Sequence, residues 1–289
     1  MEEFVLGGLA GSVAEMCVLP ALVVRTRLMV QGAGDATTMT TYNSFSHALR
    51  TIAKEEGVSA FYKGAGVNMA FTPLARGLFT LGFESSKTVI GEGTLATDFA
   101  SGTAAQLLSS FAYVPRDIIV ERTAIDGQLK NQVGSSGSSL STLRTVMAHE
   151  GFMGFYRAYL PHQFVWVPFN GIFFALLGKL HAVEESSGVP QSYMVGVFNT
   201  FVAAAGASLA TNPIDVIKTR MQVAGANPDV FSYKGPIDCL KQLLRHEGPS
   251  ALFAGLVGRI MYVAPNFALF LPTYDLLKRA IAADASSKK

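Results

Sequence analysis

The chain has 289 residues, of which 49% are hydrophobic and only 15% are charged. Soluble domains usually carry about 25% charged residues, so this deficit indicates a membrane protein. The 23 Lys and Arg nearly balance the 21 Asp and Glu, which argues against a nucleic-acid-binding protein, and the apolar content excludes a disordered chain. The two cysteines, Cys17 and Cys239, are too few for a disulfide framework or a metal cluster. We expect both to be core thiols.

Six apolar segments follow one another along the chain. They have 16 to 26 residues, close to the about 20 that a helix needs to cross the hydrocarbon layer of a bilayer. An even number of spans places both termini on the same side of the membrane. The predicted spans are residues 4–24, 65–82, 99–114, 158–180, 193–217 and 252–277.

Three landmarks recur about every 95 residues along the chain. A proline followed by charged residues comes first, a Glu-Gly pair lies about 35 residues later, and an aromatic residue follows five positions after the glycine. Such self-similarity is the signature of a repeat architecture. It predicts one structural domain built from three repeats with two spans each, at residues 1–95, 96–188 and 189–289. The landmarks are Pro20, Pro115 and Pro213, then Glu56-Gly57, Glu150-Gly151 and Glu247-Gly248, then Tyr62, Tyr156 and Phe253.

The strings that begin at these prolines resemble the signature of the mitochondrial carrier family, Pro-x-acid-x-x-base-x-base. The third string, Pro213 to Arg220, matches in full, and the other two match in part. The resemblance implies an all-α membrane protein: a threefold pseudosymmetric six-transmembrane-helix bundle with three short matrix helices, which we expect at 47–56, 142–149 and 237–246. It further implies the mitochondrial inner membrane, with both termini towards the intermembrane space.

The resemblance also implies partners. It predicts a monomer that binds a small solute and structural cardiolipin, with no other cofactor and no nucleic acid. The family holds cardiolipin where this chain has Gly64, Ala158 and Gly255. Alternatively, the glycines only permit tight turns.

Charged residues two and five positions after each proline lie three apart and so share a helix face. Charges at membrane depth must point inward and pair. In the family, the acid of one odd-numbered helix pairs with the base of the next and forms a gate on the matrix side. This predicts the ion pairs Asp117–Lys218 and Asp215–Arg25.

The remaining pair of this gate is replaced by apolar residues, Leu22 at the acidic position and Val120 at the basic one. Replacing both partners of a buried ion pair by apolar groups can be nearly neutral, so we expect these side chains to touch. The glutamine that braces such pairs in the family survives as Gln222. The predicted matrix gate consists of Leu22, Arg25, Asp117, Val120, Asp215, Lys218 and Gln222.

A second gate is expected on the cytoplasmic side, where the family carries aromatic-acid-x-x-base on its even-numbered helices. The resemblance pairs Glu84 with His181 and Asp275 with Lys87, and leaves Lys278 without an acid. His181 is either a titratable gate residue or a solvated residue at a helix end.

A substrate site should lie between the gates near mid-membrane. Residues seven or eleven apart share a helix face. Glu15, Arg76 and Asn170 lie at these spacings from the gate positions 22, 87 and 181, so they should point inward. An inward acid and base suit a mixed-charge solute, although Glu15 and Arg76 could instead simply neutralise each other.

The resemblance adds contact points one turn away from these positions. Trp166 among them could stack on a solute, or could be a core or interfacial aromatic residue. The family-derived points are Phe71, Thr72, Val165, Trp166, Tyr262 and Val263.

We therefore expect a transporter that moves a small, zwitterionic or mixed-charge metabolite by alternating access. Short segments weakly resemble the carriers for S-adenosylmethionine, iron and some amino acids, and antiport and uniport both stay open. The alternative is a carrier-derived adaptor or receptor without transport activity. An enzyme is not expected, because the five histidines form no catalytic or metal-binding constellation.

Overall fold

The computed structural model describes residues 2–32, 39–91, 94–129, 138–188, 190, 192–224 and 233–270. These residues form an all-α structure, in which an isolated bridge between Met39 and Leu129 is the one extended pairing of the described chain. The prediction of an all-α bundle is confirmed.

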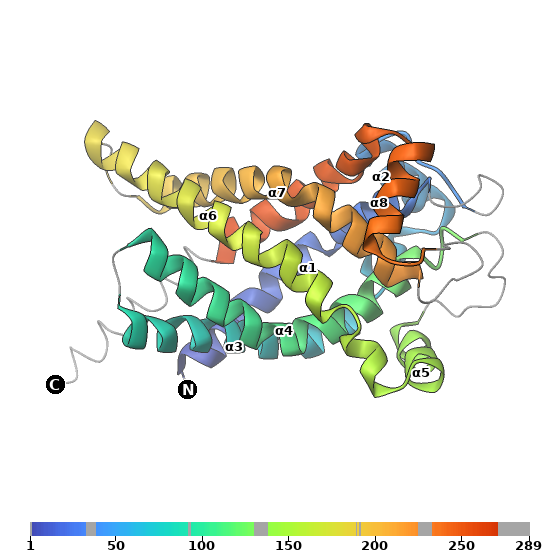
Figure 1. Cartoon of the computed structure of the whole chain (residues 1–289), viewed down its shortest axis with the longest axis horizontal. Helices are drawn as coiled ribbons and strands as arrows, with labels where there is room; N and C mark the ends of the chain where they lie inside the picture. The colour runs from blue at the N-terminus through green and yellow to red at the C-terminus, as the bar shows by residue number, and fades with distance from the viewer. Residues whose placement is uncertain are drawn as a thin grey trace.

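Six long helices form the body of the molecule (Figure 1). Those with both ends described have 26 to 32 residues, more than the about 20 needed to cross a membrane. All six predicted spans fall in or overlap them. The helices are α1 (Glu2–Val30), α3 (Ala65–Ile90), α4 (Leu95–Ile125), α6 (Tyr159–Ser187), α7 (Tyr193–Ala224) and a helix at 256–270.

By length and hydropathy alone, three stretches of the described chain could cross a membrane: Phe152–Ser187, Tyr193–Ala224 and Pro249–Phe270. They correspond to the last three predicted spans. The first three long helices do not meet this criterion, and they carry charged residues on their inner faces. In α1, for example, both Glu15 and Arg25 are buried.

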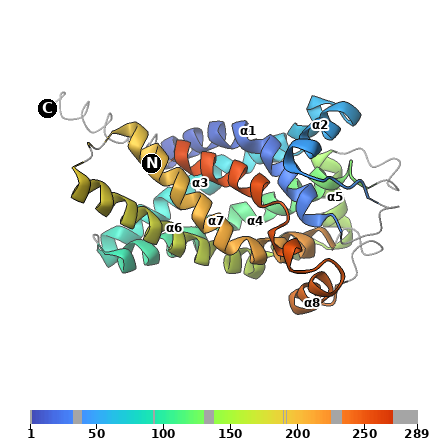
Figure 2. The ribbon, with the colours of Figure 1, turned by 90° about the horizontal axis from the view of Figure 1, so that it is seen from above.

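The first long helices of the three repeats, α1, α4 and α7, contact one another in pairs. Each is followed by a short helix and then by the second long helix of its repeat. The short helices all lie at one end of the bundle, as Figures 1 and 2 both show. They are α2 (Phe45–Glu55), α5 (Ser139–His149) and α8 (Pro236–His246), within three residues of the predicted matrix helices.

The Glu-Gly landmark ends each short helix. The glutamate is the C-cap, and the glycine adopts a positive φ, which residues with a Cβ rarely tolerate. A 3₁₀ helix then leads into the next long helix. The glycines are Gly57, Gly151 and Gly248, with φ of 83°, 68° and 84°, and the 3₁₀ helices are η1 (Val58–Tyr62), η2 (Phe152–Tyr156) and η3 (Pro249–Phe253).

The two cysteines differ in their surroundings. Cys239 on α8 is buried, as expected, and burial raises the pKa of its thiol to about 11. Cys17 is exposed, so the expectation of a core thiol is wrong there. Cys17 lies two residues, or about 200° of helical turn, from the inward-facing Glu15, and therefore points outward.

Candidate functional site: a central cavity above a ring of ion pairs

A threefold set of arginine contacts closes the end of the bundle that carries the short helices. In each repeat, the arginine seven residues after the landmark proline pairs with the glutamate of the Glu-Gly landmark. Its Nε also donates a hydrogen bond to a backbone carbonyl in the first long helix of another repeat. The Nη2–Oε2 distances are 2.9 Å for Arg27–Glu56, 3.2 Å for Arg122–Glu150 and 2.8 Å for Arg220–Glu247. The distances from Nε to the carbonyl oxygen are 2.8 Å for Arg27–Ala124, 3.2 Å for Arg122–Gln222 and 2.9 Å for Arg220–Met29.

These contacts set the electrostatics of the short helices. Glu56 is only partly buried and accepts hydrogen bonds from Arg27 and from Lys63, the latter at 3.0 Å. Burial alone would raise the pKa of the Glu56 carboxyl, but the two cations outweigh burial and hold that pKa below its ordinary value.

Two buried ion pairs lie one layer further into the bundle, where the sequence predicts the matrix gate. Lys218 Nζ is 3.3 Å from Asp117 Oδ2 and joins α7 to α4, while Arg25 pairs with Asp215 and joins α1 to α7. Burial of both pairs strengthens the attraction within each. The pairs form as the sequence predicts, and their gating role stays a prediction.

The third interface of this layer is apolar. Leu22 of α1 and Val120 of α4 are buried in the same hydrophobic cluster. Gln222 is buried too, but its side-chain amide forms no hydrogen bond with any described residue. The predicted brace therefore does not form in this structure.

Two further charged residues join this layer, and the sequence pattern did not single them out. Glu121 Oε1 lies 3.3 Å from Lys218 Nζ, so this lysine contacts two carboxylates of α4. Arg259 Nε lies 3.3 Å from Asp215 Oδ2. Glu121 follows Val120 directly, and its counterparts in the other repeats are threonines.

The predicted cytoplasmic gate is described only in part. Asp275 and Lys278 lie outside the described residues. Glu84 and Lys87 are partly buried on α3, and His181 is exposed on α6. No ion pair joins Glu84 to His181 in the described structure, and Figure 1 shows the C-terminal ends of α3 and α6 lying apart.

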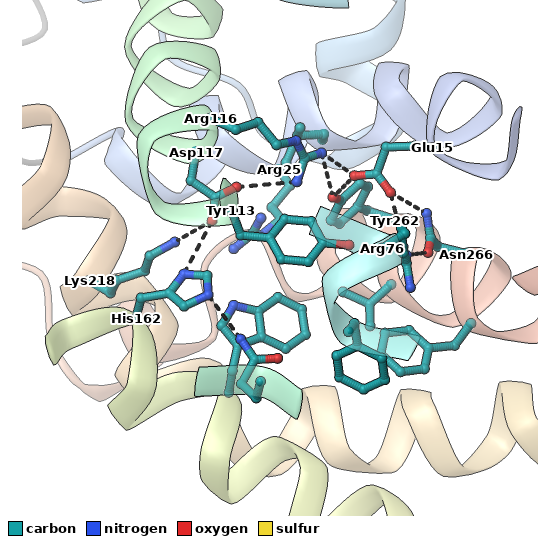
Figure 3. A pocket seen from close by; sticks show the side chains of 16 residues that line it. Glu15, Arg25, Arg76, Tyr113, Arg116, Asp117, His162, Lys218, Tyr262 and Asn266 are labelled. Atoms are coloured by element: carbon teal, nitrogen blue, oxygen red, sulfur yellow. Dashed lines mark hydrogen bonds and ion pairs between the residues drawn. The ribbon is translucent and has the colours of Figure 1, made fainter. Parts of the chain in front are cut away.

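A central cavity with an empty volume of about 670 Å³ lies between these two regions (Figure 3). Its floor is formed by Leu22, Arg25, Asp117 and Lys218 of the ion-pair layer, and its walls come from α1, α3, α4, α6 and the helix at 256–270. The lining residues are Glu15, Leu22, Arg25, Arg76, Phe79, Gln106, Tyr113, Arg116, Asp117, His162, Trp166, Lys218, Tyr262, Val263, Asn266 and Phe267.

The buried carboxylate of Glu15 is the centre of the polar wall. The side chains of Arg76, Arg116, Tyr262 and Asn266 point toward it (Figure 3). Arg116 forms an ion pair with Glu15, and Arg76 Nη2 lies 3.6 Å from Oε2. Tyr262 donates a hydrogen bond through its hydroxyl, and Asn266 donates one through Nδ2 at 2.5 Å. Glu15 and Arg76, which helical phase turned inward, thus both line this cavity, and their role in binding a solute stays a prediction.

Arg116 is the principal cavity residue that sequence reasoning missed. It lies one residue after Pro115, where the other repeats have Ala21 and Ile214. Its Nε donates to Asn68 Oδ1 at 2.5 Å, and its guanidinium also contacts Asp117 at 3.3 Å. Its departure from the other repeats, a basic residue against two apolar ones, is the signal that could have identified it.

The opposite wall is aromatic. Trp166 lines the cavity and packs edge-on against Phe169, with ring centroids 5.0 Å apart. Phe267 packs against Phe169 at 5.5 Å, and the Arg76 guanidinium lies 5.8 Å from the Phe267 ring. Trp166 therefore belongs both to the cavity wall and to the aromatic packing behind it.

Four predicted substrate residues do not line this cavity. Val165 and Asn170 are buried in α6, and Phe71 is partly buried in α3. Thr72 donates a hydrogen bond at 3.1 Å to Asn68, which in turn accepts from Arg116. Thr72 thus supports the cavity wall from behind.

The cavity and its floor carry a small excess of positive charge. Among the described buried and half-buried residues around them, five bases face four acids, which leaves an excess of one positive charge. The bases are Arg25, Arg76, Arg116, Lys218 and Arg259, and the acids are Glu15, Asp117, Glu121 and Asp215.

A lateral cleft of about 1150 Å³ opens between the second and third repeats. It lies beside the N-terminus of α6, where Ala158 is an N-cap without a side-chain hydrogen bond. Arg122 and the exposed Arg157 border it together with mainly apolar side chains.

Comparison with known proteins decides the family. The model of the mitochondrial carrier protein family matches three times, at residues 1–94, 91–184 and 189–284. The chain belongs to the mitochondrial carrier family. It is therefore a multi-pass protein of the mitochondrial inner membrane that transports a small solute.

The carrier is similar to several named relatives. It is 34% identical to mitochondrial substrate carrier family protein E of Dictyostelium discoideum, over 94% of this chain and 93% of the relative. It is 28% identical to the human mitochondrial glutamate carrier 1, over 95% and 92%. It is also 28% identical to the probable S-adenosylmethionine carrier 2 of Arabidopsis thaliana, over 97% and 74%.

Proposed function

We propose that this carrier transports a small metabolite that bears a carboxylate and an amino group on one carbon. The observation that carries the proposal is the position of Glu15 between Arg76 and Arg116 in a buried cavity. A carboxylate of the solute would compete with Glu15 for the two arginines, and the freed Glu15 would accept the ammonium group. Such an exchange of partners leaves no buried charge unpaired, which an anion or a cation alone would not achieve.

The names of the relatives support the same chemical class. Glutamate and S-adenosylmethionine, which the two relatives are named for, both contain an amino group and a carboxylate on one carbon. The single excess positive charge around the cavity suits the net negative charge of glutamate better than S-adenosylmethionine, whose sulfonium gives it a net positive charge.

We propose that transport proceeds by alternating access between the predicted gates. Asp117–Lys218 and Arg25–Asp215 would break when the matrix side opens, together with the apolar contact of Leu22 and Val120. The ion pairs link different repeats, so relative motion of the repeats would separate them. No catalytic step is part of this proposal.

Uptake by the purified carrier in liposomes tests the solute class. Radiolabelled L-glutamate and S-adenosyl-L-methionine serve as probes, with glutarate and 4-aminobutyrate as competitors that lack the amino group and the neighbouring carboxylate respectively. We expect both probes to compete with each other, and glutarate and 4-aminobutyrate to compete at least ~10-fold more weakly, which corresponds to about 1.4 kcal/mol. Equal competition by glutarate would reject the mixed-charge class.

The alternative is an adaptor or receptor without transport activity. It predicts that a folded, reconstituted protein takes up none of a broad metabolite panel. The retained inter-repeat pairs of Asp117 and Asp215 favour transport, because an adaptor would not need contacts that break and re-form between repeats.

We also propose that the lateral cleft holds a cardiolipin headgroup. Free backbone N–H groups at the N-terminus of α6 suit a phosphate, and Arg157 adds a positive charge beside an apolar wall. Cardiolipin should raise the Tm of the detergent-solubilised carrier more than phosphatidylglycerol does. Arg157→Gln should reduce this gain, whereas Arg144→Gln, an exposed arginine on α5, should not.

We propose in addition that both termini face the intermembrane space and that α2, α5 and α8 face the matrix. Six long helices and the position of the three short helices at one end of the bundle support this orientation. Tags at each terminus should be digested by protease added to mitochondria whose outer membrane is ruptured.

A further inference from the structure

His162 is a buried residue of α6 that points into the floor of the central cavity (Figure 3). Its Nε2 lies 3.1 Å from the side-chain nitrogen of Gln106, which can only donate, so Nε2 accepts this hydrogen bond. The proton of the neutral ring therefore resides on Nδ1, which lies 3.3 Å from Asp117 Oδ2.

Asp117 is thus shared by two groups that belong to different repeats. Lys218 of the third repeat lies 3.3 Å from Oδ2, as does His162 of Asp117's own repeat. When relative motion of the repeats removes Lys218, the half-buried carboxylate of Asp117 keeps only Arg116 of its two cations, which is unfavourable. His162 stays beside Asp117 and becomes an imidazolium by taking up one proton, and this would restore the missing positive charge.

We propose that His162 binds a proton that crosses the membrane together with the solute, so that the carrier is a proton-coupled transporter. This inference rests on the proposed transport function. The added proton comes from cavity water and binds Nε2, and a rotation of the Gln106 amide turns its oxygen toward the new N–H. The proton leaves when Lys218 returns to Asp117.

The charges around His162 tie this proton to gate opening. In the closed arrangement Lys218 and Arg116 already compensate Asp117, and their positive charges oppose an imidazolium. Withdrawal of Lys218 reverses the balance. Glu121 then also loses the lysine that lies 3.3 Å from its Oε1, and its negative charge favours a proton on His162 further. The titratable and charged groups around His162 and its partner are Tyr113, Arg116, Asp117 and Glu121 on α4, Asp215 and Lys218 on α7, and Arg25 on α1.

Transport into liposomes under an imposed pH gradient, with the membrane potential clamped, tests the coupling. Radiolabelled L-glutamate and S-adenosyl-L-methionine are the probes. With one proton per solute, a difference of about one pH unit should drive ~10-fold accumulation on the alkaline side. His162→Gln should abolish this accumulation, and the matched control His149→Gln, at an exposed histidine of α5, should keep it. Accumulation that ignores the gradient in the wild type, or that persists in His162→Gln, would overturn the proposal.

A second measurement needs no solute and separates this inference from the proposed function. The imidazole NMR signal of His162, assigned by its loss in His162→Gln, is titrated in nanodiscs for the wild type and for Lys218→Gln. The signal should titrate at higher pH in Lys218→Gln, because Asp117 then lacks the lysine. An identical titration overturns the proposal. If neither probe is taken up by the wild type, the proposed solute class fails and this titration alone decides the inference.

Discussion

At the scale of single residues, the cavity shows that a buried carboxylate needs more than one partner. Helical phase along α1 and α3 turns Glu15 and Arg76 inward. Arg76 Nη2 nevertheless lies 3.6 Å from Glu15 Oε2, which is longer than a hydrogen bond. Arg116, Tyr262 and Asn266 complete the coordination of the carboxylate. Simple neutralisation of Glu15 by Arg76 therefore does not describe the site.

A double-mutant comparison separates binding from structure at this site. Glu15→Gln removes the carboxylate that Arg76 and Arg116 both face, and Arg116→Gln removes the nearer of these two arginines. If these groups bind the two ends of the solute, each single change should lower uptake at least ~30-fold, since lost hydrogen bonds to charged groups are worth about 2 kcal/mol. The double variant should then stay inactive.

Restored uptake in Glu15→Gln/Arg116→Gln, or in Glu15→Gln/Arg76→Gln, would show instead that the charges only neutralise each other. Arg144→Gln, an exposed arginine of α5, should transport at the normal rate and serves as the control. Measurements of Tm for each variant establish that loss of uptake is not loss of folding.

At the scale of the elements, the first long helices of the three repeats, α1, α4 and α7, meet in three successive layers. Arginine–glutamate contacts repeat in all three units. The ion-pair layer above them has two ionic contacts and one apolar contact. The cavity above that layer has no threefold symmetry at all, because Arg116 and His162 each occur in one repeat. Symmetry is thus kept where the helices are fixed and lost where a solute without threefold symmetry would bind.

The apolar contact between α1 and α4 can be tested by restoring the missing charges. Leu22→Asp alone should destabilise the carrier by about 3–5 kcal/mol, because it buries an unpaired carboxylate. Adding Val120→Lys should recover much of that loss, as read from Tm and from uptake. Leu22→Met, which nearly conserves volume, should cost less than about 1.5 kcal/mol. A double variant no more stable than Leu22→Asp would show that positions 22 and 120 do not face each other.

The arginine–glutamate layer gives a prediction with a defined pH dependence. Glu56→Gln should lower stability by about 1.5–3 kcal/mol, because the buried Arg27 loses a charged acceptor. Glu55→Gln, at the exposed neighbouring position, should leave the Tm nearly unchanged. Equal Tm values for Glu56→Gln and Glu55→Gln would show that the Arg27–Glu56 contact does not stabilise the fold.

The pH dependence follows from the lowered pKa of Glu56. A carboxyl whose pKa is lower in the folded state stabilises the fold above its unfolded pKa, about 4.3, and loses this effect as the pH falls through the folded value. The Tm difference between wild type and Glu56→Gln should therefore stay constant from about pH 7 to about pH 5 and shrink below about pH 4. A difference that grew on acidification would contradict the assigned sign.

At the scale of the whole molecule, the sequence by itself determined the architecture. The proline, Glu-Gly and aromatic landmarks each occur three times and defined the repeats. Apolar runs of membrane-spanning length defined the six long helices. Spacing also showed that the charges after each proline share one face of their helix, whereas the resemblance to the carrier family implied which of them pair. These properties are local or periodic, so a single chain reveals them.

Only the tertiary structure decided the composition of the cavity. Glu15 meets Tyr262 and Asn266 across 247 and 251 residues of chain, and Arg116 meets Asn68 across 48 residues. Such contacts depend on the height and rotation of one helix against another, which packing sets and spacing along the chain does not. The same holds for His162, because its significance lies in sharing Asp117 with a lysine of another repeat.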